Sequence, residues 1–285
     1  MKSLLPPRKA LQASLDAHLN INSNFMEDTK DHILFKSGDV FHQFSKNYTP
    51  SNVELEKYKK LNNKLVIPYK LNTLKTKNIA FLSSPYLSGS FFIRPQLNLD
   101  INNLELLFCE LKASNTPIEI VNIKSLAKEA FSELVKLKKV IRYQDFYYIK
   151  SFFQKISIQS LQEKEEAQFL AHPMLHLRQI CIRDNTIEKV LFNNEIRTLP
   201  LSYTTRFLFT QLQNALFEDK KIWNNLVAQS KIDETIFIQK IMVSFFQTSL
   251  KLLSSYLDAD YKPGIYLFGE SIEESAKLLK KFNLI

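Results

Sequence analysis

Residues 101–150 read INNLELLFCELKASNTPIEIVNIKSLAKEAFSELVKLKKVIRYQDFYYIK, and helix, breaker and strand signals follow one another most clearly in this stretch. Apolar residues from Leu104 to Leu111 predict a first helix with one buried face. The polar run Ser114-Asn115-Thr116-Pro117 ends that helix. A second helix is predicted from Lys124 to Lys138, where apolar side chains recur at spacings of three and four.

The β-branched and aromatic residues from Val140 to Ile149 then predict a hairpin that turns at Gln144-Asp145. Helix, turn, helix and hairpin is the order of a winged helix. A related order follows downstream: a helix from Pro173 to about Arg183, a hairpin with strands Ile187–Phe192 and Ile196–Leu199, and a helix from Thr204 to Leu216. We therefore expect an α+β fold, mostly helical, with tandem winged-helix-like modules.

The first hundred residues predict a small β-rich region after a helix from Lys9 to Leu19. Residues 32–44 fit either a hairpin or a helix. The strand-like runs are Leu65–Ile67, Ile79–Leu82 and Phe91–Ile93. This region gives the first of four predicted parts, which are residues 1–100, 101–150, 151–258 and 259–285.

The last two parts contain the longest apolar helix and a docking tail. Residues from Thr235 to Leu257 are strongly apolar on one side and predict a long buried helix. In the tail, Ile265–Phe268 is predicted to be extended. Ser271 is predicted to cap a final helix, because Glu274 lies three residues later.

Glycine is unusually scarce, with only Gly38, Gly89, Gly264 and Gly269 in the chain, where roughly 20 are usual for this length. Loops that cradle phosphates and dinucleotides need clustered glycines, because the backbone must approach the ligand closely. The sequence therefore argues against a Rossmann-type site or a P-loop, and we expect no cofactor.

The net charge is +9, from 38 Lys and Arg against 29 Asp and Glu. The basic residues are dispersed, which favours a solvated surface over a dedicated binding face. DNA binding remains an alternative, in which the second helix lies in the major groove and the wing contacts phosphates. The candidate DNA-contacting residues are Lys124, Lys128, Lys136, Lys138, Lys139 and Arg142.

Two histidines, His172 and His176, are spaced four apart, as on one face of a zinc-binding helix. Pro173 disfavours helical geometry at His172, and no glutamate follows His172 to activate a water molecule. We therefore expect no metal here.

A third alternative is an enzyme with a dispersed site, whose candidate residues are His172, His176, Arg178 and Glu166. Three neighbouring glutamates, Glu163, Glu165 and Glu166, lie on a polar segment. That setting predicts solvated carboxylates with ordinary pKa values.

Cys109 and Cys181 lie in apolar stretches and predict small buried side chains in a reducing compartment. No apolar run reaches the roughly 18 residues of a membrane span, and the N-terminus lacks the apolar core of a secretion signal. The expected location is the cytoplasm.

The stretch from Leu104 to Ile149, followed by Pro173 to Val227, resembles the regulatory region of bacterial methyltransferase regulatory-domain proteins. The matching features are Asn115-Thr116-Pro117 with the elements up to Ile149, then Pro173, Asn193-Asn194 and the helix from Thr204 to Asn214. This family includes protein lysine methyltransferases. The methyl-donor domain with its glycine-rich loop is absent, so the resemblance implies a regulatory or substrate-recognition piece. We therefore expect a non-enzymatic interaction protein that binds a protein or peptide partner, and that regulates a methyltransferase if the resemblance holds.

Overall fold

The computed structural model describes residues 5–28, 32–46, 49, 70–74, 76–85, 90–91, 121–157, 161, 166–171, 180–183, 186–190, 197–218 and 220–285. The chain divides into two compact units. Unit 1 comprises Met1–Phe92 with Arg178–Ile196, and unit 2 comprises Ile93–Leu177 with Arg197–Ile285. Each unit therefore combines segments that lie far apart in the sequence.

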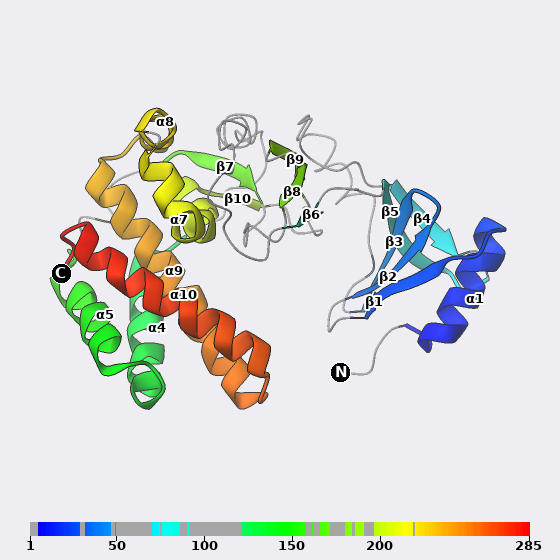
Figure 1. Ribbon diagram of the computed structural model, residues 1–285, viewed down its shortest axis with the longest axis horizontal. Helices are drawn as coiled ribbons and strands as arrows, with labels where there is room; N and C mark the ends of the chain where they lie inside the picture. The colour runs from blue at the N-terminus through cyan, green and yellow to red at the C-terminus, as the bar shows by residue number, and fades with distance from the viewer. Residues whose placement is uncertain are drawn as a thin grey trace. The chain divides into compact units, whose positions relative to one another are not determined.

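Unit 1 is built on a five-stranded antiparallel sheet (Figure 1). Its strands are β1 (Asn24–Asp28), β2 (His32–Ser37), β3 (Val40–Ser45), β4 (Lys70–Leu74) and β5 (Ile79–Pro85). They lie in the order β1-β2-β3-β5-β4. The turn from β2 to β3 contains Gly38 at φ +54°, a left-handed conformation that glycine adopts at little cost. Residues 32–44 thus form the hairpin of the two alternatives.

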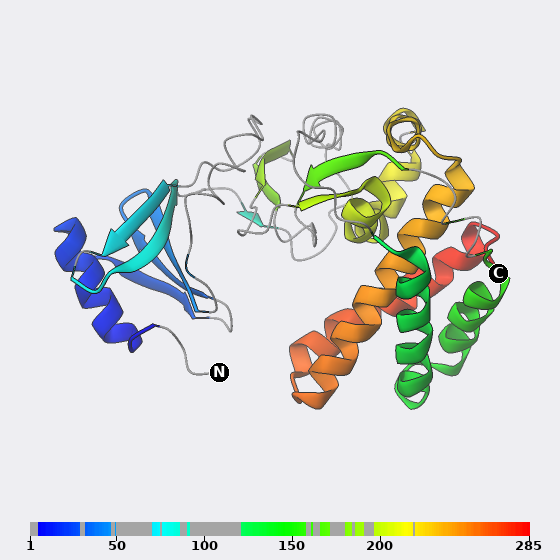
Figure 2. The same ribbon diagram turned by 180° about the vertical axis from the view of Figure 1, so that it is seen from behind.

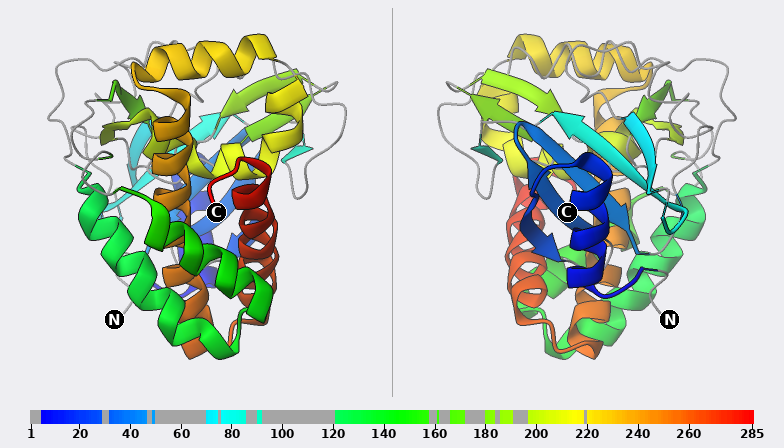
Figure 3. Two further views of the ribbon diagram at one scale, coloured as in Figure 1. Left: turned by 90° about the vertical axis from the view of Figure 1, so that its left-hand side faces the viewer. Right: turned by 90° about the vertical axis from the view of Figure 1, so that its right-hand side faces the viewer.

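Helix α1 (Arg8–Leu19) packs on this sheet and closes the core of unit 1 (Figure 3). The helix follows Pro7 and ends at Asn20, which is in the left-handed conformation. Its buried face contributes two leucines, and the sheet contributes the other core side chains. The core residues are Leu11, Leu15, Ile33, Phe35, Phe44, Leu74 and Phe81. The alternation of buried residues along β2 places Ile33 and Phe35 on the helix-facing side.

A second, three-stranded antiparallel sheet also belongs to unit 1. Its strands are β6 (Ser90–Phe91), β8 (Ile180–Arg183) and β9 (Thr186–Val190), in the order β6-β8-β9. The β8–β9 pairing brings Ile180 opposite Val190. This sheet joins residues from the two sequence segments of the unit.

Unit 2 is mainly helical in its described part (Figure 2). Its helices are α4 (Ile123–Lys136), the short 3-10 helix η1 (Leu137–Lys139), α5 (Tyr143–Lys155), α7 (Leu201–Glu218), α8 (Lys220–Ser230), α9 (Glu234–Asp258) and α10 (Lys262–Lys281). One antiparallel strand pair, β7 (Gln168–Ala171) with β10 (Arg197–Pro200), leads directly into α7.

Helix α9 is the centre of unit 2, and it packs against α4, α7 and α10. Asp233 caps it by accepting hydrogen bonds from the backbone N–H groups of Thr235 and Ile236. Its phenylalanines contact aromatic rings of α5 and α7: Phe246 meets Phe152, and Phe245 meets Phe207. The predicted buried helix Thr235–Leu257 is therefore confirmed.

Among the described helices, α9 alone is long and apolar enough to cross a membrane, because a stretch of 18 residues within it has a mean hydropathy of 1.2. In this structure 72% of that stretch is buried inside the fold. Burial against neighbouring helices is typical of the core helix of a soluble protein.

Three further predicted helices are confirmed: Lys9–Leu19 as α1, Lys124–Lys138 as α4 with η1, and Thr204–Leu216 within α7. Ile79–Leu82 lies within strand β5, as expected. The predictions for residues 104–117 and for Leu65–Ile67 lie outside the described residues.

The hairpin predicted for Val140–Ile149 is wrong, because this region enters helix α5. Its aromatic and β-branched residues favour strand locally. However, Phe146, Ile149 and Phe152 recur every three residues, and all three are buried on one helical face. Tertiary burial at helical spacing therefore outweighs strand propensity.

The second predicted module is also wrong. Ile180–Arg183, expected to be helical, forms strand β8. The strands expected as one hairpin pair elsewhere, since β9 pairs with β8 and β10 pairs with β7. Without either helix-hairpin unit, the expected tandem winged-helix modules are absent from the described chain.

The tail was predicted to be extended at Ile265–Phe268, but it belongs to the continuous helix α10. Pro263 occupies the first turn of that helix, where its missing N–H costs nothing. Ser271 lies inside the helix and donates its hydroxyl to the carbonyl of Leu267, so it caps nothing.

Candidate functional site

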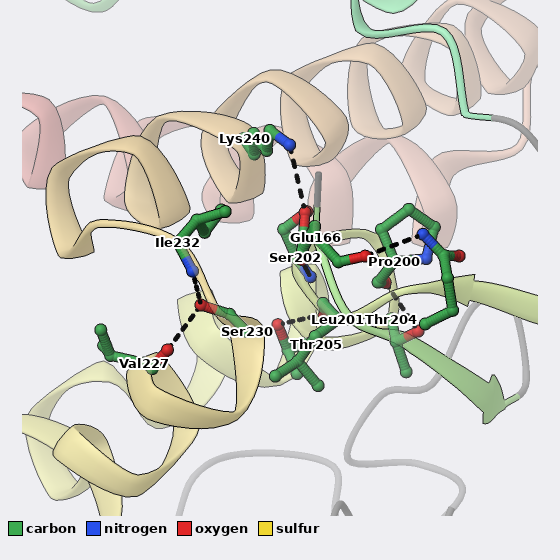
Figure 4. Close-up of polar contacts among 11 residues, drawn as sticks. Glu166, Pro200, Leu201, Ser202, Thr204, Thr205, Val227, Ser230, Ile232 and Lys240 are labelled. Carbon is green, nitrogen blue, oxygen red and sulfur yellow. Dashed lines mark hydrogen bonds and ion pairs between the residues drawn. The ribbon is translucent and has the colours of Figure 1, made fainter. Parts of the chain in front are cut away.

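A buried carboxylate, Glu166, anchors the start of strand β7 in unit 2 (Figure 4). It accepts hydrogen bonds from the backbone N–H and the hydroxyl of Ser202, the latter at 2.8 Å. Ser202 lies in the first turn of α7, where unpaired N–H groups attract negative charge. The Nζ of Lys240 on α9 lies 3.6 Å from the carboxylate. One side chain thus joins a strand and two helices.

Backbone hydrogen bonds tie the next residue, Ala167, to the same helices. Its N–H donates to the carbonyl of Ser230 at the end of α8, and its carbonyl accepts from Leu201 at the start of α7. Strand β7 ends at Ala171, so the segment 172–179 directly follows this anchored strand in the sequence. We name Glu166, Ser202 and Lys240 the Glu166 anchor.

Electrostatics make the Glu166 anchor tightly interdependent. Burial raises the pKa of Glu166, while Ser202 and Lys240 oppose that shift. The side chains of Glu166 and Lys240 are only 2% and 6% exposed, so neither charge is solvated when its partner is lost. The prediction of a solvated carboxylate at Glu166 is therefore wrong.

The sequence does carry one signal for this anchor. Lys240 is the one lysine between Thr235 and Ser249, within the strongly apolar helix, and it follows Phe237 by three residues on the buried face. A lysine on such a face needs a counter-ion. Nothing in the local sequence, however, indicates that Glu166 supplies it.

A second buried charge, Arg206 on α7, lies in the same helical unit without a carboxylate partner among the described residues. Its Nε donates to the Thr248 hydroxyl at 3.3 Å, and its guanidinium lies 3.8 Å from the centre of the Tyr203 ring. Complete burial lowers its pKa to about 10. Stacking and two hydrogen-bond acceptors replace an ion pair here.

In unit 1, strand β3 carries a buried histidine and a half-buried glutamine on opposite faces. His42 lies with its Nε2 at 2.5 Å from the Ser37 hydroxyl and its Nδ1 at 3.0 Å from the Ser83 hydroxyl. Burial, helped by His18, lowers the pKa of His42, so the ring is neutral at pH 7. Gln43 lies opposite Leu34 of β2 and Leu82 of β5.

The predicted site residues fall in different places. His172, His176 and Arg178 lie outside the described residues, so their predicted roles stay predictions. The six basic residues of the DNA-binding alternative are all exposed on or beside α4 and η1. Arg142 forms ion pairs with Asp145 at 3.0 Å and Glu273 at 3.3 Å, and Lys136 pairs with Glu133 at 2.6 Å. DNA binding by these residues stays a prediction.

No family model matches this chain, and no curated protein matches its sequence. Solved structures do match its fold. An aminoglycoside 2'-phosphotransferase-IIIa bound to GDP is 13% identical, with a TM-score of 0.66 over 95% of this chain and 99% of that chain.

Two other phosphotransferase structures match to a similar extent. A spectinomycin phosphotransferase bound to ADP and spectinomycin is 10% identical, with a TM-score of 0.65 over 97% of this chain and 98% of that chain. A choline/ethanolamine kinase family protein from Mesorhizobium loti is 10% identical, with a TM-score of 0.64 over 97% of this chain and 96% of that chain.

These matches overturn three expectations from the sequence. The resemblance to methyltransferase regulatory domains is wrong, and so is the α+β fold of tandem winged helices. The non-enzymatic regulator is also the wrong expectation, because the matched structures are phosphotransferases and a kinase. With an antiparallel N-terminal sheet and a helical C-terminal part, this chain has the kinase-like phosphotransferase fold.

Proposed function

We propose that this chain is a phosphotransferase-type enzyme that acts on a small molecule bearing hydroxyl or amino groups. The main support is that structural neighbours align over 95% or 97% of its length, so the similarity includes both units. Among the matched structures, one is bound to kanamycin, another is bound to spectinomycin, and a third belongs to the choline/ethanolamine kinase family. The bound nucleotides are GDP and ADP. These acceptors share small size and polar groups that accept a phosphoryl group.

The proposed reaction breaks the terminal P–O bond of a nucleoside triphosphate and forms a new P–O bond to an acceptor oxygen. The nucleoside diphosphate leaves, and the acceptor's proton passes to a base. We assign the base to a histidine of residues 172–179, because neutral imidazole accepts protons near pH 7. The two candidates are His172 and His176.

In the same segment, Arg178 supplies a permanent positive charge for the oxygens of the transferring group. The Glu166 anchor supports this assignment, because the segment begins directly after a strand that the anchor holds to α7 and α9. A reacting side chain must be held close to its working geometry, and a rigid strand before the segment contributes to that. We place the enzyme in the cytoplasm, a reducing compartment in which the thiols of Cys109 and Cys181 stay reduced.

The test is phosphoryl transfer by the purified full chain from ATP or GTP. The acceptors are kanamycin, spectinomycin, choline and ethanolamine, and mass spectrometry detects the phosphorylated product. We expect product with at least one acceptor, and we expect His172→Asn or His176→Asn to lower its rate by about 10²- to 10⁴-fold.

His18→Asn is the matched control, because His18 is an exposed histidine on α1, outside segment 172–179. It should leave the rate unchanged. If the folded wild-type chain phosphorylates none of these acceptors, the proposed function is wrong. If both variants in residues 172–179 keep the wild-type rate, the assignment of the base is wrong.

A further inference from the structure

Kinase-type phosphoryl transfer relies on a recognisable set of residues. A glycine-rich loop covers the phosphates, and a lysine in the third strand, in the pattern V-A-I-K, binds them. An Asp and an Asn in the pattern H-R-D-L-x-x-x-N provide the base and a magnesium ligand, and the Asp of D-F-G holds magnesium. The fold of this chain therefore implies bound Mg²⁺, and its residues can be compared with that set.

In unit 1 the phosphate-binding residues are replaced. Residues 24–37, which span β1 and β2, contain no glycine. Strand β3 begins Val40-Phe41-His42-Gln43, so glutamine stands where the pattern has lysine. His42 is held by Ser37 and Ser83 and is neutral at pH 7.

The next lysine, Lys46, does not replace the missing cation. It follows β3 directly and its Nζ forms an ion pair with Asp28 at the end of β1. The charge of that carboxylate offsets the charge that a phosphate would need. With Val40 aligned on the valine of V-A-I-K, Gln43 therefore places a neutral amide at the position of the phosphate-binding lysine.

In the segment between β7 and β8 the acidic residue is replaced too. Residues 172–179 read HPMLHLRQ and match H-R-D-L-x-x-x-N at His172 and Leu175. Met174 stands at the position of the aspartate, and Gln179 stands at the position of the asparagine. The thioether of Met174 neither accepts a proton usefully nor binds a hard cation.

The second magnesium-binding aspartate has no counterpart in D-F-G form. That triplet does not occur in the chain, and Asp184 is the one aspartate between Asp145 and Asp219. Asp184 is followed by Asn185 and Thr186 rather than by phenylalanine and glycine. In the described part of the chain, no group of three His, Cys, Asp or Glu side chains could hold a metal ion.

Mg²⁺ requires oxygen ligands, usually one or two carboxylates together with substrate phosphates. The residues present do not fit it, because Met174 replaces one aspartate and no D-F-G aspartate exists. We infer that this chain does not hold a magnesium–nucleotide complex at its kinase-like centre, so any nucleotide it binds is bound independently of divalent metal. This inference rests on the proposed function only for the identity of the nucleotide.

Calorimetric titration of the full chain with ADP and with GDP tests the inference, once in excess Mg²⁺ and once in EDTA. We expect the two dissociation constants for each nucleotide to agree within about twofold, a difference well below the ~1.4 kcal/mol of a tenfold change. A metal-dependent phosphotransferase of the same fold, titrated in parallel, verifies that the assay detects a metal effect.

Each outcome separates the inference from the proposed function. Equal affinity with and without Mg²⁺ supports both. Binding that tightens more than about tenfold in Mg²⁺ overturns the inference and leaves the proposed function standing. If neither nucleotide binds under either condition, the absence of a magnesium–nucleotide centre is supported and the proposed transfer from a nucleotide is wrong.

Discussion

Replacing Glu166 by glutamine should destabilise unit 2 strongly, because it removes the negative charge that faces the buried ammonium of Lys240. The Nζ of Lys240 lies 3.6 Å from the carboxylate, and both side chains are less than a tenth exposed. At that separation the attraction is roughly 4–5 kcal/mol for an effective dielectric constant near 20. Glutamine keeps the size and can still accept one hydrogen bond from Ser202. The expected loss is therefore about 3 kcal/mol, the lower part of the range for breaking a buried pair.

The assay is urea unfolding followed by the fluorescence of Trp223, the single tryptophan of the chain. Trp223 is buried on α8, between the rings of Phe209 and Phe237, so its signal reports on unit 2. The matched control is Glu133→Gln on α4 of the same unit. Its lysine partner, Lys136, is 62% exposed, so this change should cost less than about 1 kcal/mol.

A double-mutant cycle with Lys240→Met isolates the ion pair from the other contacts of Glu166. We expect Glu166→Gln and Lys240→Met together to cost less than the sum of the two single changes, by about 2 kcal/mol. The reasoning is refuted if Glu166→Gln unfolds within about 0.5 kcal/mol of wild type. Strict additivity of the two changes would also refute it.

Further predictions concern single groups elsewhere in the fold. Gly264→Ala should destabilise the protein by about 1–3 kcal/mol in chemical unfolding, since an added Cβ would lie 2.6 Å from the Tyr256 ring. Gly269→Ala, in open space on the same helix, should stabilise the protein by roughly 0.5–1 kcal/mol. Equal effects of the two glycine changes would contradict the packing around Tyr256. The pKa of His42 is lowered in the folded state, so on acidification the imidazole of the unfolded chain takes up a proton before that of the folded chain. Stability should therefore fall as pH drops below 6.5. His42→Gln should weaken this pH dependence of the melting temperature. An unchanged pH dependence in His42→Gln would show that the buried ring does not titrate differently on unfolding. Arg206→Met should leave stability unchanged or raise it by up to about 2 kcal/mol, because an apolar chain of similar length replaces a buried charge that has no carboxylate partner in the described part of the chain. A loss of more than about 2 kcal/mol would show that the stacking on Tyr203 dominates.

Helices with a regular apolar face were predictable from the sequence. Helices α1, α4 and α9 show spacings of three and four over several turns, so local pattern and tertiary burial agree. Helix α5 was not predictable in the same way, because Tyr143, Tyr147 and Tyr148 favour strand locally. Its helical period becomes visible only when Phe152 is read together with Phe146 and Ile149.

The fold was missed for a different reason. Pairings such as β6 with β8 join residues that lie 90 and 92 positions apart, and β7 pairs with β10 across the whole β8–β9 segment. Local periodicity contains no information on such partners. The order β1-β2-β3-β5-β4 likewise depends on contacts across the chain segment between β3 and β4.

The candidate site was hidden by substitutions. In the alignment with the kinase patterns, Gln43, Met174 and Gln179 stand at positions where those patterns have charged or ligating residues, and β1 and β2 contain no glycine. The pair His172 and His176 lies outside the described residues, so its role stays a prediction. Only the fold shows that the segment 172–179 follows strand β7 and its Glu166 anchor.

The most direct test of the proposed function is mass spectrometry of the four small-molecule acceptors after incubation with ATP or GTP and the purified full chain, in Mg²⁺ and in EDTA. The account predicts a phosphorylated acceptor and the matching nucleoside diphosphate, formed at a rate that falls in His172→Asn or His176→Asn but not in His18→Asn. No phosphorylated acceptor in either buffer, from a chain that the Trp223 signal shows to be folded, would contradict it.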